Sequence, residues 1–423
     1  MIILFVTLMS SRLAFSNPLT PKAQEMYEKY NAAVLQVRVV AKGSGEKSTL
    51  GSGFFFTPDG LVATNYHVVS DAVNYPNLFV VEYILQDGQR GPMEVMNIDP
   101  VHDLVILKIK GSVQQFFSLG NSNLSKGMKI FSFGNPYDFG LIIAEGLYNG
   151  ILEHARYRKI LFSGSLNPGM SGGPAVGTDG SVLGINVSSS GNEISFFVPV
   201  EYLQALYEEI QANKGSTFGP YWIDVIRKSL VLDEEDFLEG ILVFPSWNKR
   251  RIGMANVPGE ISNAFRCWGQ SGDNKKYWMI GTYLTCSSNE NIFLSQTMST
   301  GEIHFYYQWY ESRDDDPARF YNLYEQFASA TQKETLFENV EDRDAGNFVC
   351  DQGFVNVDKH RCKVDFCSRR YKAYEGLYDV AVQITLVDMM NKGLIINIFV
   401  SGVTDIQSKR FLLKLLNEIK WQK

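Results

Sequence analysis

The sequence predicts a mainly β N-terminal half followed by an α+β C-terminal half. Between residues 34 and 200, short apolar segments such as "NLFVVEYIL", "LVILKIKG" and "ISFFVPV" alternate with Gly, Asn and Asp. Short strands at regular spacing with turn residues between them are typical of a β-barrel or β-sandwich. Beyond residue 220, aromatic clusters and helical patterns mix with strands, which indicates a second domain in this chain of 423 residues.

The N-terminal half is expected to begin with a short helix over residues 21–33. A helix is also expected over residues 199–215, with Val200, Leu203, Leu206 and Ile210 on one buried face. The segment Lys214–Pro220 is rich in Gly and Ser and is the best candidate for a linker. Between the two helices, strands are expected at 34–43, within 51–69, and at 77–85, 104–111, 129–136, 181–191 and 194–200.

Three elements are expected in the C-terminal half. A helix is predicted within residues 314–340, and a hairpin is predicted over 379–402 with its turn at Asn391, Lys392 and Gly393. The closing helix over 404–421 should begin at the N-cap Thr404. Its buried stripe is expected to consist of Phe411, Leu412, Leu415 and Ile419.

The composition and the N-terminus bear on location and partners. Hydrophobic residues make up 45% of the chain and the net charge is −7, and without a Lys/Arg stripe no nucleic-acid partner is expected. The apolar run Ile2–Met9 is too short to span a membrane, and "Ala14-Phe15-Ser16" offers small residues for cleavage before Asn17. Residues 1–16 therefore predict an export signal, with a buried N-terminal strand as the alternative. No other segment predicts a membrane span.

The five cysteines all lie in the C-terminal half. They do not form paired Cys-x-x-Cys motifs, so no metal site is expected. In an oxidising compartment, outside the cytoplasm, two disulfides and one free thiol are expected. The local pairings are Cys267 with Cys286, and Cys350 with either Cys362 or Cys367, and five reduced thiols are the alternative.

Three segments carry residues that suit nucleophilic catalysis. His67 follows an apolar strand, although a single His in a β protein is more often structural. Asp103 precedes the apolar run "LVILK", and a carboxylate drawn toward the core needs a hydrogen-bond donor such as a His ring. Ser171 lies in "NPGMSGGP", where bare backbone lets N–H groups converge on a developing oxyanion. Alone, that segment could equally be a glycine turn.

Together, "GSGFFFTPDGLVATNYHVV", "DLVILKI" and "NPGMSGGPAVGTDGSVLGIN" resemble the motifs of trypsin-like serine proteases, and most of all the HtrA/Deg branch. The resemblance covers roughly residues 25–210, and we place the protease domain at 17–213. It implies a double β-barrel with the active site between the barrels. It also implies a triad of His67 as general base, Asp103 as orienting acid and Ser171 as nucleophile, with the N–H groups of Gly169 and Ser171 as the oxyanion hole.

Alternatives and departures remain beside this assignment. Asp99 is a rival acid and His102 a rival base, while Met170 stands where the family usually has Asp or Asn. The segment Ser165-Leu166-Asn167 should help to line the S1 pocket and carries no charge. A charged side chain would lack a partner there, so cleavage is expected after small or medium aliphatic residues.

The sequence predicts an exported, periplasmic or secreted serine endopeptidase that acts on proteins or peptides, in protein quality control. No cofactor is implied, and homo-oligomers occur in the resembled family. Residues 214–423 are expected to form a separate α+β domain of unknown role rather than a PDZ domain, because the Gly-Asp-x-Ile element of that module is missing. Two alternatives are kept. The protease fold could be a latent or inactive binding protein with the C-terminal domain as interaction module, or that domain could hold the main activity.

Overall fold

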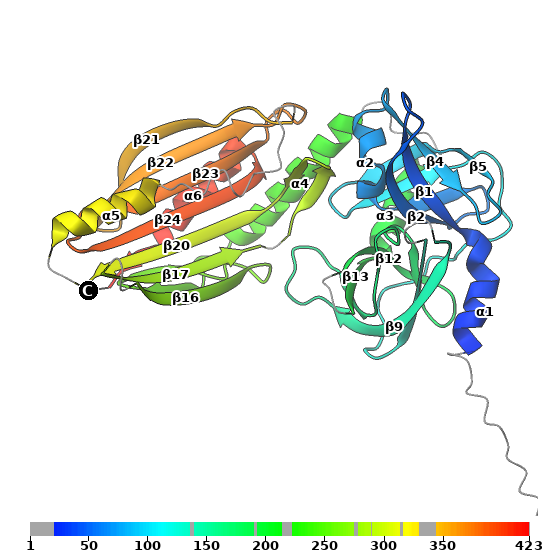
Figure 1. Cartoon of the computed structure of the whole chain (residues 1–423), viewed down its shortest axis with the longest axis horizontal. Helices are drawn as coiled ribbons and strands as arrows, with labels where there is room; N and C mark the ends of the chain where they lie inside the picture. Colours follow the sequence, from blue (N-terminus) through cyan, green and yellow to red (C-terminus); the bar gives the residue numbers. More distant parts are fainter. Residues whose placement is uncertain are drawn as a thin grey trace, which may run out of the picture.

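The computed structural model describes residues 21–422 apart from 136–138, 190–192, 214–221, 275–277, 289, 314–315 and 330–343. Figure 1 shows the N-terminal and C-terminal halves side by side, with a long helix, α4 (Trp222–Leu242), running from one toward the other. The expected export signal and the expected linker lie outside the described residues.

The first sheet of the N-terminal half has seven antiparallel strands in the order β5-β4-β1-β2-β3-β7-β6. Helix α1 (Pro21–Tyr30) and a 3₁₀ turn (Asn31–Ala33) lead into it, as expected from the sequence. A second helix, α2 (Tyr66–Asn74), follows β3 directly. The strands are β1 (Val34–Ala41), β2 (Lys47–Phe55), β3 (Leu61–Thr64), β4 (Phe79–Ile84), β5 (Arg90–Pro92), β6 (Glu94–Asp99) and β7 (Leu104–Lys108).

The second sheet closes into a six-stranded barrel in the order β10-β13-β12-β11-β8-β9. Helix α3 (Val200–Ala212) follows it and buries all four residues of the predicted stripe. Phe54 of the first sheet and Phe133 of the barrel each pack edge to face with Phe117, which lies in the segment between β7 and β8. The barrel strands are β8 (Lys129–Gly134), β9 (Ile142–Ile151), β10 (Ile160–Ser163), β11 (Pro174–Val176), β12 (Val182–Ser189) and β13 (Ile194–Pro199).

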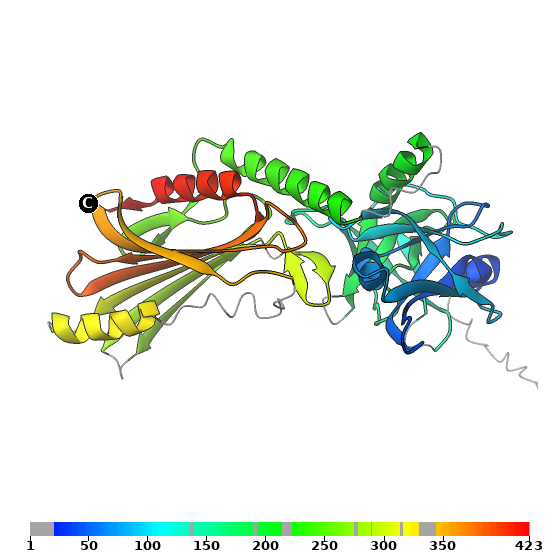
Figure 2. The ribbon, with the colours of Figure 1, turned by 90° about the horizontal axis from the view of Figure 1, so that it is seen from above.

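The C-terminal half is built on a seven-stranded antiparallel sheet in the order β16-β17-β20-β24-β23-β22-β21. Helices α4 and α6 (Asp405–Glu418) lie on one side of it and α5 (Pro317–Ser329) on the other (Figure 2). Its strands are β16 (Arg266–Asn274), β17 (Met279–Ser287), β20 (Ile303–Ser312), β21 (Val349–Val357), β22 (His360–Arg370), β23 (Tyr378–Leu386) and β24 (Lys392–Val403).

Shorter strands complete this half. The pair β14 (Lys249–Ile252) and β15 (Ala255–Pro258) joins β25 (Lys420–Trp421) in a three-stranded sheet. A separate hairpin is formed by β18 (Ile292–Ser295) and β19 (Met298–Thr300). The prediction of a mainly β N-terminal half followed by an α+β half is confirmed.

Several element predictions for the C-terminal half can be compared with the structure. The Thr404 side chain accepts a hydrogen bond from the Gln407 N–H at 3.3 Å, and the predicted stripe of α6 is buried. The predicted hairpin forms between β23 and β24, but its turn lies before Lys392. Asn391, with φ 55°, rather than Gly393 takes the left-handed conformation. Helix α5 ends at Ser329, and the remainder of the segment predicted as helical lies largely outside the described residues.

Two disulfides link neighbouring strands of the large sheet. Cys267 bonds Cys286 across β16 and β17, as predicted. Cys350 bonds Cys367 because the register of β21 and β22 places these two residues opposite each other, and Cys362 is a buried free thiol. Within the described part of the chain, no helix is long and apolar enough to cross a membrane.

Candidate active site

His67 lies in the first turn of α2, at the end of β3. The N-cap residue of this helix, Asn65, is extended, with φ −80° and ψ 150°, so the chain changes direction between Thr64 and Tyr66. The Asn65 side-chain amide donates to the Asp103 carbonyl oxygen at 2.8 Å, and the Tyr66 N–H donates to the same oxygen at 3.2 Å. These bonds hold the residue before β7 against the start of α2.

The Asp103 carboxylate contacts His67 twice. Oδ2 lies 2.7 Å from His67 Nδ1, and Oδ1 accepts a hydrogen bond from the His67 backbone N–H at 2.8 Å. A carboxylate that accepts from Nδ1–H leaves Nε2 as the basic atom of the neutral ring. The same carboxylate sits at the N-terminus of α2, where a negative charge is favourable.

Two opposing effects act on the imidazole of His67. Burial disfavours the charged ring and lowers its pKa, whereas the negative charge of Asp103 and its hydrogen bond raise it. The effect of Asp103 prevails, so the pKa of His67 is raised above its usual value. Asp103 therefore stabilises the imidazolium that a general base becomes when it accepts a proton.

The rival residues pair with each other. His102 Nδ1 lies 2.6 Å from Asp99 Oδ2, and Asp99 Oδ1 accepts from the His102 N–H at 3.1 Å. The His102 ring also stacks on Tyr202, with ring centroids 3.7 Å apart. The structure therefore joins Asp103, and not Asp99, to His67.

The backbone around Ser171 forms two consecutive turns. Pro168 and Gly169 occupy the centre of the first, in which the Met170 N–H donates to the Asn167 carbonyl at 3.0 Å and Gly169 has φ 95°. A positive φ at the third position is the type II turn that favours Pro followed by Gly. Gly172 also has a positive φ of 85°.

Gly172 brings the Ser171 turn against the segment that carries His67. A Cβ added to Gly172 would overlap Thr64 Oγ1 and the Ser52 carbonyl oxygen, and would lie 3.0 Å from the Asn65 backbone nitrogen. Ser52 ties the turn down as well. Its hydroxyl donates to the Gly169 carbonyl at 2.7 Å, and its N–H donates to the Ser171 carbonyl at 2.8 Å. Glycine is required here because the two backbones approach so closely.

The N–H groups of Gly169 and Ser171 have no acceptor among the described residues, unlike those of Met170, Gly172 and Gly173, which are bonded within the turn. Two unpaired N–H groups beside a serine are available to an anionic oxygen. They are the two groups that the sequence assigns to an oxyanion hole.

The Ser171 hydroxyl does not make the hydrogen bond to His67 that the triad assignment requires. It donates to the Val187 carbonyl oxygen of β12 at 3.3 Å, and among the described residues this is its one hydrogen bond. His67 and Asp103 are thus joined, and the Ser171 backbone adjoins their segment, while the Ser171 hydroxyl is bonded to strand β12 of the barrel.

Met170 and the predicted S1 residues differ in their burial. The Met170 side chain is fully buried against Gly134, and its sulfur accepts from the Asn167 N–H at 3.5 Å. Ser165 and Asn167 are exposed, whereas Leu166 is half-buried against the barrel core. The segment is uncharged, as the specificity prediction assumes.

Three buried hydroxyl residues position the site and were not singled out from the sequence. Ser52 holds the Ser171 turn, Thr64 Oγ1 donates to the Ser52 carbonyl at 2.7 Å, and Ser195 Oγ donates to the Gly164 carbonyl at 2.7 Å. Ser195 also accepts from the Leu166 N–H at 3.2 Å. In the sequence, each of them is a small polar residue inside an apolar strand. Such residues also occur at purely structural positions, so this pattern alone does not indicate a site.

Comparison with known proteins places this half of the chain in a protein class. Residues 51–185 match the family model of the trypsin-like peptidase domain. Within that class the chain resembles the HtrA branch, as the sequence predicts.

It is 34% identical over 175 residues to the "Probable periplasmic serine endoprotease DegP-like" of Chlamydia pneumoniae, covering 39% of this chain and 34% of that relative. It is 31% identical over 179 residues to "Serine protease HTRA2, mitochondrial" of Drosophila virilis, covering 40% and 42%. The crystal structure of the serine endoprotease from Yersinia pestis is 25% identical, with a TM-score of 0.40, over 45% of this chain and 67% of that one. The chain thus spans less than half of the length of these two sequence relatives.

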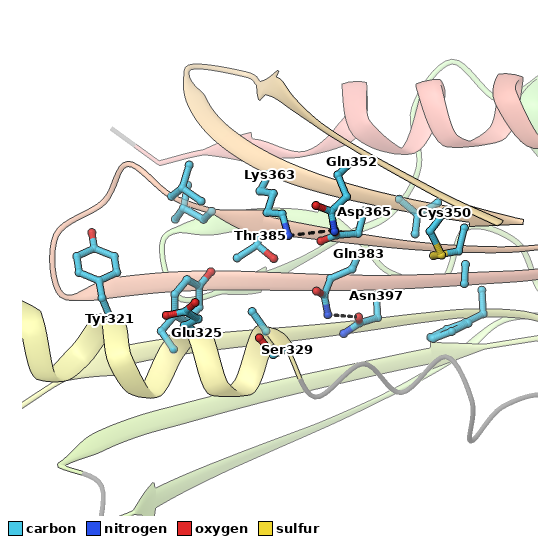
Figure 3. A pocket seen from close by; sticks show the side chains of 18 residues that line it. Tyr321, Glu325, Ser329, Cys350, Gln352, Lys363, Asp365, Gln383, Thr385 and Asn397 are labelled. Carbon is cyan, nitrogen blue, oxygen red and sulfur yellow. Dashed lines mark hydrogen bonds and ion pairs between the residues drawn. A yellow bond between two sulfur atoms is a disulfide. The ribbon is translucent and has the colours of Figure 1, made fainter. Parts of the chain in front are cut away.

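A cavity of about 570 Å³ lies in the C-terminal half, between α5 and strands β21 to β24 (Figure 3). At its floor Gln383 Nε2 donates to Asn397 Oδ1 at 3.0 Å, and Lys363 pairs with Asp365 at 3.0 Å. The buried Thr385 hydroxyl in its wall has no hydrogen-bond partner among the described residues. The cavity contains none of the predicted catalytic or S1 residues, so it is distinct from the candidate active site.

Proposed function

We propose that the chain is an exported serine endopeptidase that cleaves peptide bonds with a triad of Ser171, His67 and Asp103. The observation that carries the proposal is the double contact of Asp103 with His67, 2.7 Å from ring and 2.8 Å from backbone, beside the Ser171 turn. The similarity to serine endoproteases supports it. The proposed peptidase domain extends over residues 17–213, and the proposed C-terminal domain over 214–423.

In the proposed reaction, His67 Nε2 takes the proton of the Ser171 hydroxyl as Oγ attacks the carbonyl carbon of the substrate. The developing oxyanion accepts hydrogen bonds from the N–H groups of Gly169 and Ser171, and Asp103 stabilises the imidazolium. His67 then donates the proton to the leaving amine, which leaves an acyl group on Ser171. Water, deprotonated by His67, hydrolyses this ester. The Ser171 hydroxyl must first leave the Val187 carbonyl.

We further propose that cleavage follows small or medium aliphatic residues, such as Val, Ala or Leu. The support is the uncharged segment Ser165-Leu166-Asn167, which offers no partner to a charged side chain. A library of fluorogenic peptides that differ in the residue before the scissile bond tests this. Efficient cleavage after Arg or Glu, with none after Val or Leu, contradicts it.

The proposed location is the periplasm or the extracellular space. Two disulfides support an oxidising compartment, and the relative from Chlamydia pneumoniae is named periplasmic. Protein substrates, a role in protein quality control and a homo-oligomeric state are part of the proposal through the HtrA-branch resemblance alone. Fractionation of cells that express the full chain tests the location.

A catalytically latent protein is the second candidate, and one observation favours it. The Ser171 hydroxyl is bonded to Val187 rather than to His67, so the nucleophile of this conformation is not activated. A fluorophosphonate probe with intact-mass detection distinguishes the candidates. Labelling of the wild type and not of Ser171→Ala is expected for an active peptidase, and an unlabelled wild type favours the latent protein.

A further inference from the structure

The hairpin β18–β19 of the C-terminal half packs on the helix that carries His67. Its residues Ile292, Leu294 and Met298 are buried in the same apolar cluster as Tyr66 and Val69 of α2. In Figure 2 this hairpin lies at the end of the C-terminal half that faces the N-terminal half. The contact therefore joins the two halves beside the proposed active site.

Hydrogen bonds from the first and the last residue of α2 hold the hairpin in place. The Tyr66 hydroxyl, at the first residue of the helix, donates to the Leu294 carbonyl oxygen at 3.2 Å. The Asn74 side-chain amide, at its last residue, donates to the same oxygen at 2.8 Å. Tyr374 donates to Asn74 Oδ1 at 3.4 Å. One carbonyl of β18 is thus held at a defined place relative to His67.

Phe293 lies between Ile292 and Leu294 on β18. Phe293 is half-buried and packs against the same apolar cluster as its two neighbours. Its ring centroid is 6.0 Å from that of His67, with an interplanar angle of 73°. This edge-to-face geometry is the favourable one for aromatic rings.

We propose that Phe293 is a positioning residue of the peptidase site, so that the C-terminal half supplies part of the site. The inference rests on the proposed peptidase function. Asp103 holds the imidazole of His67 at Nδ1. The edge-to-face contact with Phe293 gives the ring a second contact and limits its rotation.

The test compares Phe293→Ala, the conservative Phe293→Leu and the matched control Phe354→Ala in the full chain. Phe354 is an exposed Phe of β21 in the large C-terminal sheet. The second-order rate of fluorophosphonate labelling is measured between pH 5 and 9. At the pH optimum, Phe293→Ala is expected to be labelled about tenfold more slowly than the wild type, which corresponds to the loss of one aromatic pair. Phe354→Ala is expected to be labelled at the wild-type rate.

The pH profile separates positioning from a merely structural role. Among the described residues Asp103 is the charged group that acts on the imidazole, and it is unchanged in these variants. Burial lowers the pKa of His67, so removal of the Phe293 ring raises that pKa and moves the midpoint of labelling to higher pH. Phe293→Leu restores apolar cover and should return both rate and midpoint toward the wild type.

The outcomes are distinguishable. Wild-type rate and midpoint in Phe293→Ala overturn the inference and leave the peptidase function standing. A slower Phe293→Ala with a lower melting temperature, an unmoved midpoint and no rescue by Leu also overturns it, because the ring is then only structural. A wild type that is unlabelled at every pH overturns the peptidase function, and this inference with it.

Discussion

Asp103 contacts both the His67 side chain and the backbone at the start of α2. Its carboxylate contacts the ring and the backbone N–H of His67, while its carbonyl accepts from Asn65 and Tyr66. To reach all these groups the residue adopts φ 57°, a strained conformation for a non-glycine residue. Such strain persists where the surrounding bonds determine the backbone, as they do here.

Asp103→Asn is predicted to lower the rate of fluorophosphonate labelling by about 10⁴-fold, the effect known for the orienting acid of a triad. The neutral amide cannot stabilise the imidazolium as a carboxylate does, and its NH₂ group favours the wrong tautomer of the ring. Asp99→Asn is the matched control, because Asp99 lies four residues before Asp103, at the end of β6, but pairs with His102. Equal rate losses in both variants would refute the assignment of Asp103.

Gly172→Ala is predicted to abolish labelling and to lower the free energy of unfolding by more than about 2 kcal/mol. The left-handed backbone costs a non-glycine residue about 1–2 kcal/mol, and the new Cβ would overlap Thr64 and Ser52. Urea denaturation measures the stability. Gly272→Ala is the control, since a Cβ at Gly272 meets open space. A labelled Gly172→Ala would show that the close approach of the two backbones is dispensable.

At the scale of secondary-structure elements, one buried cluster of charged side chains joins the barrel to α4. Arg156, in the loop between β9 and β10, contacts Asp233 Oδ2 at 2.6 Å and Glu234 Oε2 at 2.9 Å. Its guanidinium also donates to the Gly301 carbonyl at 2.8 Å and lies 3.9 Å from the Phe237 ring centroid. Burial raises the pKa of Glu234 to about 7, although Arg156 opposes this shift.

Glu234→Gln is predicted to flatten the dependence of stability on pH. The folded-state pKa of Glu234, about 7, exceeds its ordinary value of 4.5, so the folded state binds the proton more tightly. Stability from this group is therefore present below pH 4.5 and is lost as the pH rises to 7, by about 3 kcal/mol at 1.36 kcal/mol per pKa unit.

Urea denaturation at pH 5 and pH 8 measures this difference between wild type and Glu234→Gln. The control is Glu235→Gln, because Glu234 and not Glu235 is the residue that contacts Arg156. A Glu234→Gln variant with the same pH response as the wild type would mean that Glu234 is ionised throughout this range.

The disulfides are predicted to stabilise the edges of the large sheet. They close loops of 19 and 17 residues, and a loop of about 15 residues corresponds to about 3 kcal/mol of stabilisation. The double variant Cys267→Ser, Cys286→Ser should lose about this amount in urea denaturation. The control is Cys362→Ala, in which both disulfides remain. Dithiothreitol should lower its free energy of unfolding by as much as it lowers that of the wild type. A double variant as stable as the wild type would contradict the prediction.

At the scale of the whole molecule, local patterns were sufficient for the N-terminal fold and for the candidate triad. His67 and Asp103 border apolar strands, and Ser171 lies in a glycine-rich turn, so sequence alone could propose them. The sequence favoured Asp103 over the rival Asp99, and in the structure Asp103 contacts His67 while Asp99 pairs with His102.

Contacts between distant segments could not be predicted. Tyr66 and Leu294 are 228 residues apart, and no pattern in either segment indicates the other. The pairing of Cys350 with Cys367 rather than Cys362 likewise depends on the register of β21 and β22, which a strand pattern does not fix. Phe293 was missed for the same reason.

The apolar cluster that the two halves share makes the folding stability of each half depend on the other. It unites Tyr66 and Val69 of α2 with Trp222 and Ile226 of α4 and Leu294 of β18, all of them buried. Each apolar side chain that becomes exposed costs about 1.5–3 kcal/mol, and a typical domain is stable by only about 5–15 kcal/mol. A chain that ends after residue 213 loses every partner that lies beyond that point.

Residues 17–213 expressed alone are therefore predicted to melt at least about 10 °C below the full chain, since 1 kcal/mol shifts the melting temperature of a domain of this size by about 2–4 °C. They should also bind an apolar dye and react slowly with fluorophosphonate, because Phe293 and the partners of α2 are absent. Co-expression with residues 214–423 should restore the melting temperature and the labelling rate, since the contacts that join the halves are non-covalent. A fragment 17–213 with the melting temperature and labelling rate of the full chain would show that the cluster contributes nothing to either.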